Sequence, residues 1–104
     1  MNIDELTKQA LVIKDKYALK NATSGHKEWS AKEFMLGFVG DVGDLAKLIM
    51  AKENLRHIDN VDAKLSHELA DNLWSILVLA EHYGVNLEVE FAKTMGELEK
   101  RISA

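Results

Sequence analysis

Proline is absent from this chain of 104 residues. Proline is the residue that most effectively breaks a helix, and glycine, the next strongest breaker, occurs only six times. No segment alternates polar and apolar residues over the length of a strand, and no Asn-Gly or Asp-Gly hairpin turn is present. The sequence therefore predicts an all-α fold with long helices.

Helical spacing of apolar residues and local cap signals divide the chain into four helices. Ser30 and Glu33 have the spacing of a capping box, and Gly84 is a natural C-terminal stop. We expect the helices to form one antiparallel four-helix bundle, a single domain over residues 1–104. The expected helices run from about Ile3 to Lys20, from Ser30 to about Asn54, from the start signal Asp59-Asn60-Val61-Asp62 to about Tyr83, and from Asn86 to about Ile102.

Composition and charge exclude several classes of function. Cysteine is absent, which excludes disulfides, thiolate metal ligands and cysteine nucleophiles. The formal net charge of −4 argues against broad binding to a nucleic-acid polymer, which needs a basic surface. No secretory signal is visible, and no apolar run reaches the roughly 20 residues that a membrane span needs. We therefore expect a cytoplasmic protein that does not bind a membrane.

The main candidate for a functional site is a pair of carboxylates on each of two helices. Asp41 and Asp44 are three residues apart in the second expected helix, and Glu68 and Asp71 have the same spacing in the third. Residues three apart share one helix face, so adjacent helices would bring all four carboxylates together. Oxygen ligands of this kind suit Mg²⁺ or Mn²⁺, and like charges on otherwise apolar helices repel each other unless a cation or water intervenes.

A simpler interpretation of the acids on the third helix also stays open. The polar residues of that helix form one stripe, as they do on the solvated face of an ordinary amphipathic helix. The second helix adds an observation in favour of a site, because Gly37 and Gly40 lie on the same side as Asp44 and leave space for a ligand. The stripe on the third helix consists of Lys64, Glu68, Asp71, Ser75 and His82.

The segment Gly40-Asp41-Val42-Gly43-Asp44-Leu45, followed by Glu68-Leu69-Ala70-Asp71, resembles the E-E-x-x-E…E-x-x-D motif of the MazG-like nucleoside triphosphate pyrophosphohydrolases. The resemblance extends from about Trp29 to Arg101 and includes the Lys93-Thr94-Met95 segment. It departs from the motif where Gly40 replaces the first acid, and where the aspartates at 41 and 44 replace longer glutamates.

The resemblance implies an oligomeric all-α NTP pyrophosphohydrolase that hydrolyses a nucleoside triphosphate to a monophosphate and pyrophosphate with Mg²⁺, or alternatively Mn²⁺. It implies that Asp41, Asp44, Glu68 and Asp71 are both metal ligands and catalytic residues, with Asp41 the preferred general base. Two alternatives stay open: an inactive oligomer of the same fold that only binds nucleotide or metal, and an enzyme like the phosphoribosyl-ATP pyrophosphohydrolases.

Four further residues are candidates for binding the substrate. Trp29 is suited to stack on a base, and the Asn72 amide to bond a base edge. Lys93 and Arg101 are suited to neutralise phosphates if the fourth helix reaches the acids. Each has a structural alternative: a hydrophobic staple for Trp29, a helix–helix hydrogen bond for Asn72, and solvated cations near a helix end for the other two.

The third expected helix is apolar on nearly every side around Trp74 and the run Ile76-Leu77-Val78-Leu79. One small protomer has too little other chain to cover such a helix. We therefore expect a homodimer or a dimer of dimers. A helical interaction protein whose acidic stripe is merely solvated is the remaining alternative from another functional class.

Overall fold

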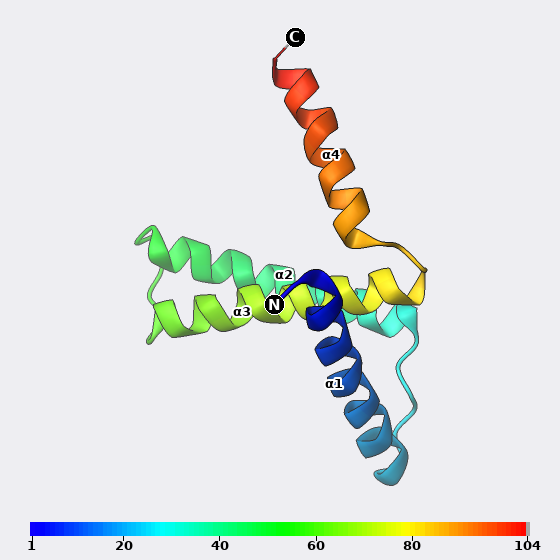
Figure 1. Cartoon of the computed structure of the whole chain (residues 1–104). Coiled ribbons are helices and arrows are strands. Elements are labelled where there is room, and N and C mark those ends of the chain that lie inside the picture. The colour runs from blue at the N-terminus through cyan, green and yellow to red at the C-terminus, as the bar shows by residue number, and fades with distance from the viewer. Residues whose placement is uncertain (104) are drawn as a thin grey trace.

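The computed structural model describes residues 1–103, which form four helices and no strand. The all-α class and the number of helices are thus confirmed. Each helix begins and ends within about three residues of the predicted bounds. Over the described residues, no helix is long and apolar enough to cross a lipid bilayer. The helices are α1 (Ile3–Thr23), α2 (Ala31–Lys52), α3 (Val61–His82) and α4 (Leu87–Ile102) (Figure 1).

Local side-chain bonds explain where the helices begin and end. The Ser30 hydroxyl donates to the Glu33 carboxylate, which also accepts the backbone N–H of Ser30 at 2.9 Å, and these bonds lower the pKa of Glu33 to about 2. Asn86 accepts the backbone N–H of Val89 at 3.2 Å and so caps α4. Gly84 follows α3 with a φ of +67°, a left-handed conformation that favours glycine at a helix end.

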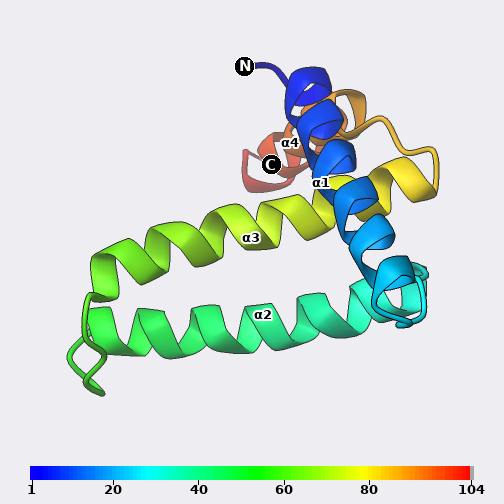
Figure 2. The same cartoon turned by 90° about the horizontal axis from the view of Figure 1, so that it is seen from below.

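The helices α2 and α3 form an antiparallel pair, and α1 crosses the C-terminal half of α3 (Figure 2). A small core lies where the three helices meet, with Ala10 from α1, Phe34 from α2, and Leu77 and Val78 from α3. The indole N–H of Trp74 donates to the backbone carbonyl of Ala10 at 3.0 Å. This bond, together with the core, fixes α1 on α3.

The chain is more open than the closed four-helix bundle expected from the sequence. Its radius of gyration is 16.6 Å, whereas a compact domain of this length has about 13 Å. The reason is α4, which has no buried residue and extends from the end of α3 to the side opposite α1 (Figure 1). Three helices thus form the body of the chain, and the fourth projects from it.

We expect Trp74→Phe to lower the free energy of unfolding by about 1–2 kcal/mol, because it removes the hydrogen bond to Ala10 and part of a packed ring. Urea unfolding measures this loss. Trp29→Phe is the matched control, since Trp29 is 47% exposed and its indole makes no hydrogen bond within residues 1–103. Equal losses in the two variants would contradict the role assigned to the Trp74 bond.

Candidate metal centre

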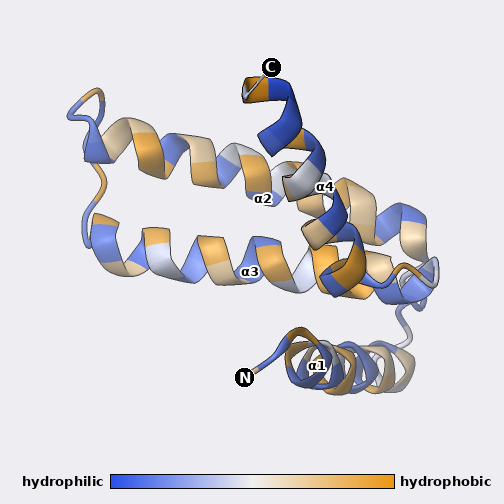
Figure 3. Cartoon of the chain, turned by 45° about the horizontal axis from the view of Figure 1, so that its top comes forward, coloured by the Kyte–Doolittle hydropathy of each residue, from blue (hydrophilic) through white to orange (hydrophobic). Residues whose placement is uncertain are grey.

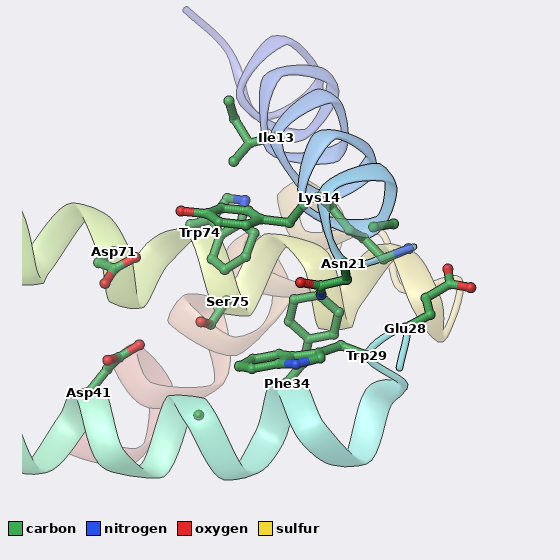
Figure 4. Close-up of a pocket in the computed structure, with 13 residues that line it drawn as sticks. Ile13, Lys14, Asn21, Glu28, Trp29, Phe34, Asp41, Asp71, Trp74 and Ser75 are labelled. Atoms are coloured by element: carbon green, nitrogen blue, oxygen red, sulfur yellow. The ribbon is translucent and has the colours of Figure 1, made fainter. Parts of the chain in front are cut away.

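Three of the four predicted acids meet between α2 and α3. Asp41 and Asp44 extend from α2 and Glu68 from α3, and one carboxylate oxygen of each lies within 4.8 Å of the others. Asp71, one turn after Glu68 on α3, lies just outside this group and faces Asp41 across the gap between the helices (Figure 4). The antiparallel pairing therefore brings together the two acidic pairs that the sequence places on separate helices.

Two buried side-chain oxygens at this site, one of them from an acid of the group, lack a hydrogen-bond partner among the described residues. They are Oε2 of Glu68 and Oδ1 of Asn72, and neither has a partner among residues 1–103. Asn72 is only 7% exposed, and its amide nitrogen donates to the backbone carbonyl of Glu68 at 2.7 Å. Buried oxygens are normally paired, so a group that attracts oxygen lone pairs, such as a cation or a proton donor, fits this position.

The electrostatics of the site also favour a cation. Burial raises the pKa of Asp41, and the nearby Asp71 and Asp44 carboxylates raise it further. Burial likewise raises the pKa of Glu68. The Asp41, Asp71 and Asp44 carboxylates raise it further, while His67 lowers it. Both acids are therefore harder to ionise than usual, and a bound divalent cation would reverse that penalty.

The donor set fits a small hard cation after a modest adjustment. Mg²⁺ binds oxygen at about 2.1 Å, so two of its ligands lie at most about 4.2 Å apart. The 4.8 Å spread of the three carboxylate oxygens is slightly larger. Asp44 is exposed and has room to move inward, and a bridging water is the other way to close the difference. Asp41, Asp44 and Glu68 are thus the residues that would hold the ion, with Asp71 beside them.

An aromatic pocket of about 520 Å³ begins at these acids, and Asp41 and Asp71 form one end of its wall (Figure 4). Its size is within the usual range for small-molecule sites. The ring of Trp29 lies against Gly37 of α2, where a Cβ would come within 3.2 Å of the indole. The aromatic residues that line the pocket are Tyr17, Trp29, Phe34 and Trp74.

Three of the four rings in this wall, those of Trp29, Phe34 and Trp74, pack edge to face, which fixes their positions. The Trp29 and Phe34 centroids lie 5.4 Å apart at 74°, and those of Phe34 and Trp74 lie 5.6 Å apart at 66°. Tyr17 continues the series from α1, with its centroid 6.2 Å from that of Trp74. The pocket is therefore lined by rings that also belong to, or touch, the hydrophobic core.

The other predicted binding residues are placed differently. Trp29 lines the pocket, whereas Asn72 is buried and does not line it. Lys93 and Arg101 are exposed on α4, which is not part of the pocket wall. Within one chain, the fourth helix therefore brings no cation to the acids.

Lys14 and Asn21 of α1 line the pocket, and the sequence analysis did not identify them. They give the pocket a cation and an amide on the side opposite α2 (Figure 4). No local pattern marks either residue, because their position depends on how α1 crosses α3, a contact between distant segments.

Comparison with protein-family models, with curated proteins and with solved structures found no match to this chain.

We expect the protein without metal to lose stability as the pH rises from about 4 towards neutrality. In the folded state the pKa values of Asp41 and Glu68 are raised, so the folded protein keeps protons that the unfolded chain, with values near 3.8 and 4.5, releases. Mg²⁺ should restore stability at pH 7, by about 2.7 kcal/mol when its concentration is a hundred times the Kd. Thermal unfolding from pH 4 to 8, with and without Mg²⁺, measures both effects.

Asp41→Asn removes one of the repelling charges. We therefore expect this variant to unfold at a higher temperature than the wild type without metal at pH 7, and to gain little from Mg²⁺. Asp15→Asn, at an exposed position of α1 outside the pocket, is the control and should respond to Mg²⁺ like the wild type. An equal gain from Mg²⁺ in all three proteins would contradict a metal site at Asp41.

Proposed function

We propose that this protein is a Mg²⁺-dependent nucleoside triphosphate pyrophosphohydrolase. The observation that carries the proposal is the position of the acids at one end of an aromatic pocket. A nucleotide has the same two parts, a flat base and a chain of anionic phosphates that needs a cation. The resemblance to the MazG-like motif supports the same reaction.

The reaction adds water to the α–β phosphoanhydride and releases a nucleoside monophosphate and pyrophosphate. A Mg²⁺ ion, when bound, neutralises charge on the phosphate oxygens and on the departing pyrophosphate. Asp41 lies at the meeting point of the acids and the pocket, where its carboxylate is placed to accept a proton from the attacking water. Asp44 and Glu68 hold the cation, and Asp71 orients the water or completes the ligand set.

The aromatic pocket receives the base in this proposal. Trp29 offers a ring face between Gly37 and the pocket interior, and base–aromatic stacking contributes roughly 1–3 kcal/mol. Lys14 supplies positive charge on the α1 side, where it pairs with a phosphate or orients the sugar. The protein itself contributes mainly positioning, which is what phosphoryl transfer requires.

Incubation with Mg²⁺ and a panel of ribo- and deoxynucleoside triphosphates tests the activity, with monophosphate and pyrophosphate as the measured products. We expect Asp41→Asn and Asp71→Asn to lower kcat/KM by about 10²-fold or more, the usual effect of losing a catalytic carboxylate. Asp15→Asn should keep wild-type activity.

Absence of pyrophosphate release with every nucleotide, with Mg²⁺ and with Mn²⁺, would refute the hydrolase proposal. Stabilisation by a nucleotide without turnover would then indicate the inactive binding protein considered above.

The proposed role of the pocket in binding the base is tested by substitutions at Trp29. We expect Trp29→Ala to raise KM about tenfold or more with a smaller effect on kcat, because stacking stabilises bound substrate and transition state alike. Trp29→Phe should retain most of the affinity, since it keeps a ring against Gly37. Steady-state kinetics on the preferred nucleotide measure both parameters, and an unchanged KM in Trp29→Ala would place the base elsewhere.

A further inference from the structure

Asn72 is a polar side chain buried between two helices that are otherwise largely apolar. Figure 3 shows apolar positions recurring along both α2 and α3. Among residues 1–103, the two buried polar residues are Asn72 and Ser75, and only Asn72 carries an amide. Burying an amide costs free energy unless its atoms are hydrogen-bonded, so the partners of this one need an explanation.

One hydrogen bond sets the orientation of the Asn72 amide. Its nitrogen donates to the backbone carbonyl of Glu68, one turn earlier on α3, at 2.7 Å. A reversed amide would place its oxygen against that carbonyl, so the bond decides which atom is the oxygen. Oδ1 is therefore held on the other side of the amide, where it is buried and has no partner within residues 1–103.

The side of α3 that bears Asn72 is the side that meets the acids of α2. Glu68 and Asn72 are four residues apart, so they lie one above the other on the same side of the helix. Glu68 is the acid of α3 whose carboxylate comes within 4.8 Å of those of Asp41 and Asp44. The unpartnered oxygens of Glu68 and Asn72 thus belong to one helix face, and that face lies against the aspartates.

The register of the helix pair places Asn72 across from Asp41. Lys52 of α2 and Asp62 of α3 form an ion pair at 2.7 Å near the loop that joins the two helices. Counted along both antiparallel helices from this ion pair, Asp41 is opposite position 73, next to Asn72. The core at the other end of the pair gives the same register to within two residues.

We propose that Asn72 is a positioning residue of the metal centre, whose Oδ1 accepts a hydrogen bond from the hydration shell of the cation held by Asp41, Asp44 and Glu68. The inference rests on the metal site of the proposed function. Mg²⁺ usually keeps several waters when it binds to protein carboxylates. Because its amide is tied to its own helix, Asn72 meets the ion through one of these waters and not as a direct ligand.

An amide suits this position better than a further acid would. It offers an oxygen in a fixed direction without adding negative charge to acids that already repel one another. The carboxylates thus supply the charge that holds the ion, and Asn72 supplies an acceptor that orients its water. This role differs from the contact with a base edge that the sequence suggested for Asn72.

An ordered water without an ion is the simpler occupant, because one water can donate to two oxygens. Such a water would satisfy Oδ1 of Asn72 and Oε2 of Glu68, but it would leave the repulsion among the acids uncompensated. The two occupants differ in a measurable way. Only the hydrated ion makes the affinity for a divalent cation depend on Asn72.

Asn72→Leu tests the proposal, because leucine has nearly the same shape and no oxygen. Without metal, this variant should melt about 4 °C or more above the wild type, since it removes a buried oxygen that lacks a partner. The Glu68 carbonyl keeps its backbone bond within α3. The variant should bind Mn²⁺, used as the probe, at least tenfold more weakly. Scanning calorimetry of the metal-free protein and isothermal titration with Mn²⁺ measure the two effects.

Asn72→Asp is the complementary variant, because it keeps an oxygen in place and adds a charge. It should melt below the wild type without metal, and at pH 7.5 it should bind Mn²⁺ at least as tightly as the wild type. Stability and ion affinity thus change in opposite directions, which a purely structural role for Asn72 would not produce. Ser66→Leu, at an exposed position on another side of α3, is the matched control and should bind Mn²⁺ like the wild type.

These measurements use the full chain and the ion alone, so they do not depend on hydrolysis of a nucleotide. Wild-type affinity in Asn72→Leu would overturn the role of Asn72 and leave the proposed hydrolase standing. Weaker binding by Asn72→Asp than by the wild type would also overturn it, and this result holds even if Asn72→Leu does not fold. A wild type that binds neither Mn²⁺ nor Mg²⁺ would overturn both proposals.

Discussion

The antiparallel contact between α2 and α3 carries both the apolar packing of this protein and its charged site. At one end of the contact, Phe34 packs with Leu77 and Val78 of α3 in a small core. Further along, Asp41, Asp44 and Glu68 come within 4.8 Å of each other between the same helices. The apolar end stabilises the pair, whereas the acids oppose it through burial and mutual repulsion. Such a conflict is typical of a site retained for its chemistry, because a solvated arrangement would avoid the repulsion.

Trp74 links the core to the proposed binding pocket. Its indole N–H donates a hydrogen bond to the Ala10 carbonyl of α1, and its ring contacts the rings of Phe34 and Tyr17. Lys14 and Tyr17 reach the pocket only because α1 is docked in this way. The pocket is therefore a product of the α1–α3 contact, and loosening that contact should disturb ligand binding before it disturbs the α2–α3 pair.

Local signals explain why the helices were predictable from the sequence while their arrangement was not. The cap residues Ser30 and Asn86 and the terminal Gly84 act on their immediate neighbours, so they place the helix ends within a few residues. The three-residue spacing of the acids likewise needs only the helix repeat, and the structure brings both pairs to one place. The place of Lys14 in the pocket depends on a contact between distant segments, the crossing of α1 and α3. The direction of α4 follows from its having no buried contact with the other helices. No short sequence pattern encodes either feature.

The lengths of the acidic side chains set how such a site would respond to its ion. Asp41 and Asp44 are each one methylene shorter than glutamate, so Glu68, the longer side chain, must reach across from α3. The oxygens remain slightly farther apart than the roughly 4.2 Å that two ligands of one Mg²⁺ ion allow. Binding would then draw exposed Asp44 inward and displace protons from Asp41 and Glu68, whose pKa values are raised. The displacement of protons opposes binding at low pH, so affinity for the ion should increase with pH until these acids are fully ionised.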